Sequence, residues 1–106
     1  MKILKCLYLE DQLNCYADLV HICNQTKDAK LIIDHAKDIS EANEQLNSIS
    51  YDVLLADIQL REGMVFDYLE SIIPDSLSIS LIFVTAYDQY ATKAFEFEAT
   101  DYLLKP

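Results

Sequence analysis

The chain has 106 residues, a length that fits one domain built around a single core. Its composition is that of an ordinary globular protein, with 52% hydrophobic and 25% charged residues. Charged or amide residues interrupt every apolar run before it could cross a bilayer, and the first residues carry no small-residue cleavage site. The formal net charge of −10 argues against direct nucleic-acid binding, which needs a basic surface. We therefore expect a cytoplasmic domain that contacts neither membrane nor nucleic acid.

Short apolar runs alternate along the chain with stretches of helical periodicity. The apolar runs predict strands over residues 6–9, 31–33, 52–57, 80–85 and 102–104. Apolar residues recur at helical spacing in 12–25, 42–49, 66–72 and 91–99. Asp38 is a suitable cap for the second of these helices, Gly63 indicates a turn, and Pro74 ends the third helix.

The predicted strands are apolar throughout instead of alternating, which is typical of a parallel sheet covered on both faces. Right-handed crossovers through the intervening helices then give a doubly wound, flavodoxin-like α/β domain. We expect a five-stranded parallel sheet in the order 2-1-3-4-5. The chain stops after the fifth strand, where a fifth helix should follow, so we expect residues 1–106 to be one domain truncated at that point.

Polar side chains follow the strands at the point where each one ends. In a parallel sheet these ends meet at one edge, and the order 2-1-3-4-5 makes the first and third strands neighbours at the ligand-binding switch point. Three carboxylates should converge there, with a hydroxyl and an ammonium group beside them. The residues are Glu10 and Asp11 after the first strand, Asp57 after the third, Thr85 after the fourth and Lys105 after the fifth.

Three crowded carboxylates repel one another and should attract a hard cation such as Mg²⁺. A carboxylate beside Mg²⁺ can attack a phosphoryl donor, which would give an aspartyl phosphate on Asp57. The cation and Lys105 would neutralise charge on the transferred group. Each residue alone has an ordinary structural explanation, since strand-end aspartates and lysines are usually solvated. The interpretation depends on their joint arrangement.

Three segments resemble the receiver domains of bacterial response regulators, in particular those that precede LytTR-type DNA-binding domains. They are residues 57–60, residues 83–96 and the ending Asp101-Tyr102-Leu103-Leu104-Lys105-Pro106. The resemblance covers essentially the whole chain except the last helix of the family. It implies a two-component signalling switch, not a classical enzyme, that takes a phosphoryl group from a histidine kinase and controls an output domain, expected to be transcriptional.

Carried over to this sequence, the resemblance implies a phosphoacceptor and a magnesium site. Asp57 is similar to the phosphorylated aspartate and would also bind Mg²⁺. Asp11 matches the direct acidic ligand, and Glu10 matches its neighbour that acts through water. The main-chain carbonyl of Gln59 would supply a further ligand.

The resemblance also implies a set of switch residues. Thr85 matches the hydroxyl residue that turns toward the phosphoryl group, Tyr102 the aromatic residue that moves with it, and Lys105 the lysine that pairs with phosphoryl oxygens. The face around the fourth helix and fifth strand would carry dimerisation or output contacts, for which Tyr90 and Phe97 are candidates. Because the last helix is absent, apolar surface on the first and fifth strands and on the first helix lacks its cover. We therefore also expect a homodimer or higher species that covers this surface, and not only the face of the fourth helix and fifth strand.

Three other functions share parts of this pattern. A magnesium-dependent phosphohydrolase needs a second acid two residues after the nucleophile, where this chain has Gln59. A flavin mononucleotide carrier needs a phosphate cradle after the first strand, where Glu10 and Asp11 would repel phosphate. A pseudo-receiver that binds partners without phosphorylation stays open as the alternative.

The two histidines are expected to be structural. His21 falls on the first predicted helix and His35 just past the second strand, both away from the predicted site edge. We expect surface or boundary roles for them instead of metal binding.

Overall fold

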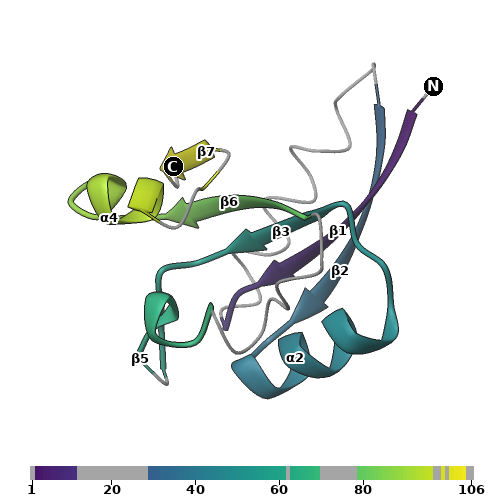
Figure 1. Ribbon diagram of the computed structural model, residues 1–106, viewed down its shortest axis with the longest axis horizontal. Helices are drawn as coiled ribbons and strands as arrows, with labels where there is room; N and C mark the ends of the chain where they lie inside the picture. Colours follow the sequence, from purple (N-terminus) through teal and green to yellow (C-terminus); the bar gives the residue numbers. More distant parts are fainter. Residues whose placement is uncertain are drawn as a thin grey trace.

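Five strands form one parallel sheet in the computed structural model, which describes residues 2–11, 29–61, 63–69, 79–96, 99 and 101–104 (Figure 1). The strands are β1 (Lys2–Leu9), β2 (Ala29–Ala36), β3 (Val53–Ala56), β6 (Ser80–Thr85) and β7 (Asp101–Leu104). Their order is β2-β1-β3-β6-β7, with every neighbouring pair parallel. This confirms the predicted order 2-1-3-4-5, with β6 and β7 as its fourth and fifth strands.

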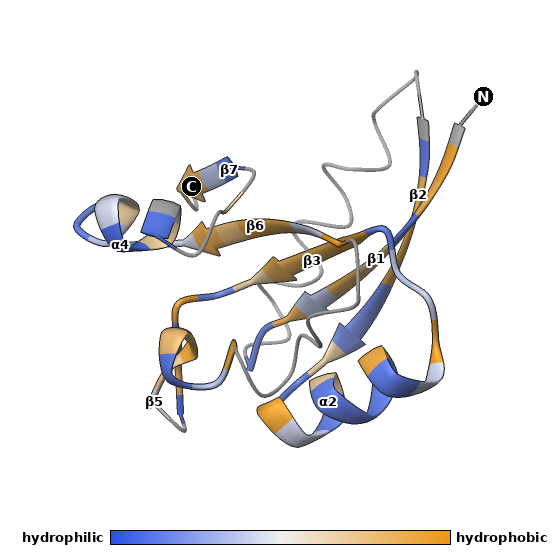
Figure 2. Ribbon diagram, viewed as in Figure 1, coloured by the Kyte–Doolittle hydropathy of each residue, from blue (hydrophilic) through white to orange (hydrophobic). Residues whose placement is uncertain are grey.

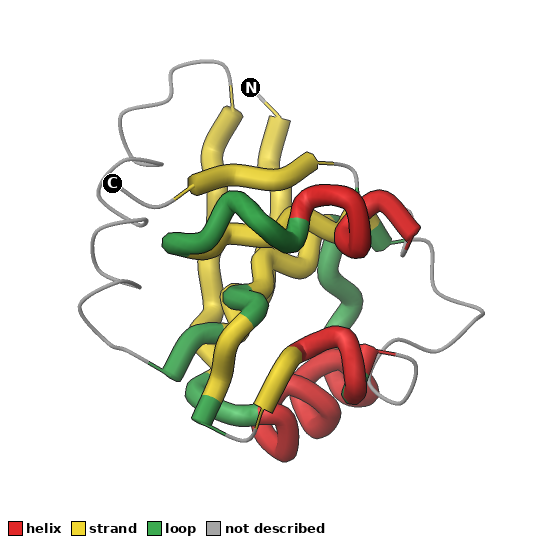
Figure 3. Tube along the Cα trace, turned by 90° about the vertical axis from the view of Figure 1, so that its left-hand side faces the viewer, coloured by secondary structure: helices red, strands yellow, loops and turns green. Residues whose placement is uncertain are grey.

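Short elements connect and flank these strands in the described part of the chain. They are the helices α2 (Ile39–Ser48) and α4 (Ala91–Glu96), the 3-10 turn η1 (Val65–Asp67), and the hairpin of β4 (Gln59–Leu60) with β5 (Gly63–Met64). Figures 1 and 3 show α2 beside the β2 edge of the sheet and α4 toward its β7 edge. None of the described helices is long and apolar enough to cross a membrane.

Helix α2 begins where the sequence predicts. The Asp38 carboxylate accepts a hydrogen bond of 2.8 Å from the main-chain N–H of Glu41, which is the expected N-cap geometry. Ala42 and Leu46 bury the apolar stripe of the helix, whereas Ile49 lies just past its end and is 36% exposed.

The core has two parts, one on each face of the sheet. One face buries alternate residues of the central strands together with side chains of α2, η1 and α4, and the other face buries the intervening residues. The first cluster includes Leu7, Leu9, Leu54, Ala56, Leu81, Phe83, Ala42, Phe66 and Ala94, and the second includes Cys6, Tyr8, Leu55 and Val84. Figure 2 shows the resulting hydrophobic colour along β1, β3 and β6. Both faces are buried, as apolar strands predict.

The structure corrects several predicted bounds. Strands β1 and β2 pair over eight residues each, much longer than the apolar runs 6–9 and 31–33. Strand β2 is at the sheet edge, where polar Asp34 and His35 are tolerated, so the apolar run marks only its middle.

The hairpin of β4 and β5 was not predicted as such. Its turn depends on Gly63, whose φ of 127° is unfavourable for residues with a side chain. The predicted helix 66–72 begins in the 3-10 turn η1, and its residues 70–72 lie outside the described residues, as does the whole predicted helix 12–25.

Candidate functional site

The register of the sheet brings the strand-end acids to one place. Leu9 of β1 pairs with Ala56 of β3, so the residues that follow them, Glu10 and Asp57, lie side by side. The N–H of Asp57 donates to the carbonyl of Leu9, and the N–H of Glu10 donates to the carbonyl of Ala36, both at 3.0 Å. Both acids therefore lie at the carboxyl ends of β1 and β3, at the switch point between the first and third strands.

Glu10, Asp11 and Asp57 form one compact cluster, as their strand-end positions predicted. A carboxylate oxygen from each residue lies within 4.8 Å of the other two. Glu10 is fully buried and Asp57 is 7% exposed, whereas Asp11 is half-buried. Two like charges about 4 Å apart repel by about 4 kcal/mol even at an effective dielectric constant of about 20. The cluster is therefore strongly disposed to take up a cation.

The donors of this cluster fit Mg²⁺. All three are carboxylate oxygens, the hard ligands that Mg²⁺ prefers. Direct ligands lie about 2.0–2.1 Å from the ion, so two of them can be at most about 4.2 Å apart. The oxygens of this cluster lie within 4.8 Å of one another. These distances suit an ion that is bound directly by some of the carboxylates and through a water molecule by another.

Neighbouring groups hold both acids of the β1 end in place. Asp11 Oδ2 accepts from the main-chain N–H of Arg61 at 3.0 Å, which ties the β1 end to the turn between β4 and β5. The Tyr8 hydroxyl donates to Glu10 Oε2 at 3.3 Å. His35 Nε2 donates to the main-chain oxygen of Glu10 at 2.6 Å.

The contact of His35 corrects the sequence-based expectation. The apolar pattern predicts His35 just past the second strand and away from the site, but His35 lies within β2 and contacts Glu10 directly. The error has the same origin as the short prediction for β2, because an imidazole at the end of an edge strand interrupts the apolar pattern. His21 lies outside the described residues.

Further predicted site residues lie at the end of β6 and at the start of β4. Thr85 ends β6 and is fully buried, and its Oγ1 accepts from the main-chain N–H of Tyr87 at 3.3 Å. Gln59 begins β4, and its side-chain Nε2 donates to the Tyr90 hydroxyl at 3.1 Å. Lys105 lies outside the described residues.

Tyr102 is engaged with the segment that follows Thr85. Its hydroxyl donates to the main-chain oxygen of Tyr87, and burial is the largest cause of its raised pKa, so the phenol stays a donor. The Tyr87 and Tyr90 rings are 6.0 Å apart, and Tyr90 lies 6.4 Å from Phe66. Together with the bond from Gln59 to Tyr90, these contacts connect β7 to the loop after Asp57.

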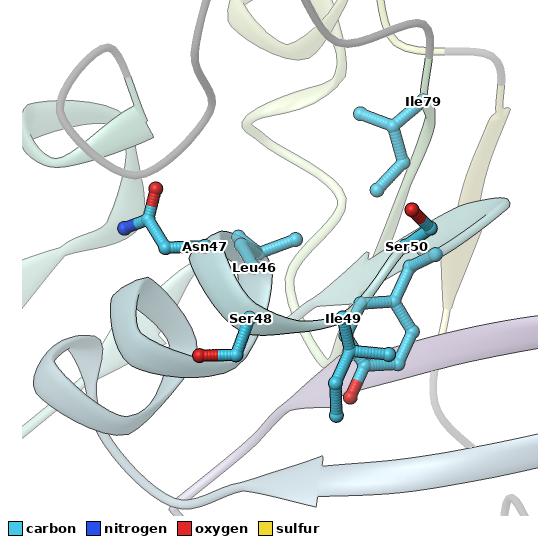
Figure 4. A pocket seen from close by; sticks show the side chains of 7 residues that line it. Leu46, Asn47, Ser48, Ile49, Ser50 and Ile79 are labelled. Atoms are coloured by element: carbon cyan, nitrogen blue, oxygen red, sulfur yellow. The ribbon is translucent and has the colours of Figure 1, made fainter.

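A separate pocket lies at the amino ends of the strands, away from the acidic cluster at their carboxyl ends (Figure 4). Its volume is about 320 Å³, and it is lined by residues 46–51 and Ile79. Residues 50 and 51 precede β3 and Ile79 precedes β6, so the pocket faces the amino ends of the strands whereas the acids follow the carboxyl ends. It contains no acidic residue and is not part of the site.

Sequence comparison gives one family over nearly the whole chain. The family of the response regulator receiver domain matches residues 7–106. The sensory transduction protein LytT of Bacillus cereus is 35% identical over 104 residues, which cover 98% of this chain and 42% of that protein. LytR of Staphylococcus haemolyticus is 35% identical over 103 residues, or 97% of this chain and 40% of that protein. The chain thus spans about two fifths of the length of these relatives.

Solved structures show the same fold. The non-phosphorylated HemR receiver domain of Leptospira biflexa has a TM-score of 0.75 and 27% identity, and the match covers 96% of this chain and 82% of that one. TrrA of Thermotoga maritima, solved in complex with Mg²⁺ and BeF, has a TM-score of 0.75 and 24% identity, with 100% and 88% covered. By family match, sequence identity and fold, this chain belongs to the receiver domains of two-component response regulators.

Proposed function

We propose that this chain accepts a phosphoryl group on Asp57 in a Mg²⁺-dependent reaction and acts as a signalling switch. The observation that carries the proposal is the cluster of Glu10, Asp11 and Asp57, with oxygens within 4.8 Å of one another at the switch point of the sheet. A buried group of like charges weakens the fold, so a binding role explains why it is there.

Mg²⁺ would be held by Asp11 and Asp57, by Glu10 through water, and by the main-chain carbonyl of Gln59. When bound, it would supply positive charge opposite the oxygens of the transferred group. The complex of the similar TrrA with Mg²⁺ and BeF, a phosphoryl mimic, supports the proposal that a receiver of this fold binds Mg²⁺.

The transfer itself needs one nucleophile and one leaving group. A carboxylate oxygen of Asp57 forms a bond to phosphorus while the bond from phosphorus to the donor breaks, and the electron pair departs with the donor. With a histidine kinase as donor, the leaving atom is an imidazole nitrogen, which takes up a proton. Asp57 suits this role because it is fixed by its bond to Leu9, yet it is not completely enclosed.

The switch would operate through Thr85, Tyr102 and Lys105. The Thr85 hydroxyl would leave the N–H of Tyr87 and turn toward the phosphoryl group, while Lys105 pairs with the phosphoryl oxygens. That change would disturb the segment to which the Tyr102 hydroxyl is bound. A switch requires such contacts to differ between its two states.

We further propose that the chain belongs to a longer regulator with a histidine kinase as partner and a LytTR-type DNA-binding output domain. Its similarity to LytT and LytR, which are more than twice as long, supports this proposal. A homodimer would use the face of α4 and β7, where Tyr87, Leu103 and Leu104 are large and exposed.

A small phosphodonor such as acetyl phosphate, supplied with Mg²⁺, is expected to add one phosphoryl group to the chain. Asp57→Asn should abolish the addition, because the amide is a far weaker nucleophile, whereas Asp67→Asn at an exposed position should leave it unchanged. Intact-mass measurement decides the matter. Labelling of the Asp57→Asn variant would assign the phosphoacceptor elsewhere, and an unlabelled wild type would favour a pseudo-receiver.

Removing one charge from the cluster should stabilise the metal-free protein. We expect Asp57→Asn to raise the free energy of unfolding by about 1–3 kcal/mol in a chelator, since it relieves repulsion at a nearly buried site. Mg²⁺ at one hundred times the dissociation constant should stabilise the wild type and Asp67→Asn by about 2.7 kcal/mol and leave Asp57→Asn unchanged. Urea melts of both proteins and of Asp67→Asn measure these differences. A wild type that is more stable than Asp57→Asn without metal would contradict the repulsion argument.

Substitution of the switch residues should leave phosphorylation of Asp57 intact but impair the conformational change that follows it. Thr85→Ala and Lys105→Ala are expected to retain labelling but to lose most of the spectral change that beryllofluoride induces at α4 and β7. Thr85→Ser keeps the hydroxyl and should respond, as should the exposed control Thr92→Ala. Amide chemical shifts recorded with and without beryllofluoride provide the test. A full response in Thr85→Ala and Lys105→Ala would place the coupling in other residues.

A further inference from the structure

The end of β2 holds the main chain of Glu10 from both sides. The N–H of Glu10 donates to the carbonyl of Ala36 at 3.0 Å, and the carbonyl of Glu10 accepts from His35 Nε2 at 2.6 Å. The first contact continues the sheet ladder, but the second is made by a side chain. It is also shorter than the usual range of about 2.7–3.2 Å for N–H···O bonds.

The direction of this hydrogen bond is fixed by its acceptor. A carbonyl oxygen carries no proton, so the proton between the two atoms must belong to Nε2 of His35. The imidazole therefore acts as a donor to Glu10. A side chain of similar reach with an N–H group could take its place, whereas an apolar side chain could not.

The carbonyl that His35 holds belongs to the peptide bond between Glu10 and Asp11. That unit is planar, so fixing its oxygen fixes the plane from which both residues project their side chains. The carboxylates of these two residues belong to the acidic cluster. Separate contacts reach their side chains, from the Tyr8 hydroxyl to Glu10 and from the Arg61 N–H to Asp11. His35 is the contact that sets the peptide between them.

We propose that His35 is a positioning residue for the metal site, which fixes the Glu10–Asp11 peptide and thereby raises the affinity of the cluster for Mg²⁺. The proposal rests on the proposed function, since it concerns the same site. Groups that orient metal ligands typically change metal affinity by about 10–100-fold when they are removed. Without His35, the peptide plane can rotate and the two carboxylates lose their preset direction.

The surroundings of His35 allow it to be substituted cleanly. The side chain borders an open cavity of about 350 Å³ with Glu41, Glu44 and Gln45, so other side chains have room there. His35→Gln keeps an N–H donor, and His35→Leu and His35→Phe remove it. Tyr51→Phe is a matched control. It deletes the 2.6 Å hydrogen bond from the Tyr51 hydroxyl to Asp34, the residue before His35 in β2, and leaves the hydrogen bond from His35 to Glu10 in place.

The test measures Mg²⁺ binding and stability in the full chain. Isothermal titration calorimetry with Mg²⁺ gives the dissociation constants, and thermal melts in a chelator give the stabilities. We expect His35→Leu and His35→Phe to raise the dissociation constant about tenfold or more, and His35→Gln to restore most of the affinity. Tyr51→Phe should lower the melting temperature while it leaves the dissociation constant unchanged. Exchange of the Asp11 amide hydrogen, which belongs to the same peptide, should accelerate in His35→Leu and not in Tyr51→Phe.

Each other outcome counts against the proposal. Wild-type affinity in His35→Leu, or equal losses in His35→Gln and His35→Leu, would overturn the positioning role while the proposed function stands. If His35→Leu and His35→Phe both fail to fold, the bond serves the fold itself and the proposal is likewise overturned. A wild type that does not bind Mg²⁺ would overturn the proposed function and this inference together.

Discussion

The parallel register between β1 and β3 is the constraint on which the site depends. Because Leu9 pairs with Ala56, Glu10 and Asp57 follow the paired strands at the same level, and their carboxylates come together with that of Asp11. Residues far apart in the sequence are thereby forced into mutual repulsion. A typical domain is stable by only about 5–15 kcal/mol, so the apolar clusters on both faces of the sheet must offset this cost.

The two sides of the acidic cluster are built differently. On the β2 side, His35 and Ala36 fix the main chain of Glu10 with two hydrogen bonds. On the β6 side, the described contact of the buried Thr85 hydroxyl is one hydrogen bond, accepted from the main-chain N–H of Tyr87. The rings of Tyr87 and Tyr90 lie beyond it. A rigid side suits the binding of a metal, and a side held by a few replaceable hydrogen bonds suits a change of state. If the proposed function is correct, the β2 side would stabilise the metal site and the β6 side would carry the change of state.

The sequence predicts β3 and β6 well because most of their residues are buried. The run 80–85 coincides with β6, and the strand-end positions of Glu10, Asp11 and Asp57 were enough to predict their convergence. Prediction fails where the chain is only partly buried. The polar end of β2 hid both the length of that strand and the contact of His35, and nothing in the apolar pattern of residues 59–64 indicates the hairpin of β4 and β5.

Side-chain contacts that depend on tertiary packing could not be read from the sequence either. The bond from Gln59 to Tyr90 joins the start of β4 to the residue before α4 and has no local signature. Conversely, Asp38 was predictable as a cap because its partner, the N–H of Glu41, lies three residues away.

The most direct test of the account is the location of a bound divalent ion. Mn²⁺ takes the same oxygen ligands as Mg²⁺, and its unpaired electrons broaden the nuclear magnetic resonance signals of nearby amides. At substoichiometric Mn²⁺, we expect the amide signals of residues 9–11 and 57–59 to disappear first and excess Mg²⁺ to restore them. Broadening centred instead on the exposed acids of α2, or spread evenly over this acidic chain, would contradict this expectation.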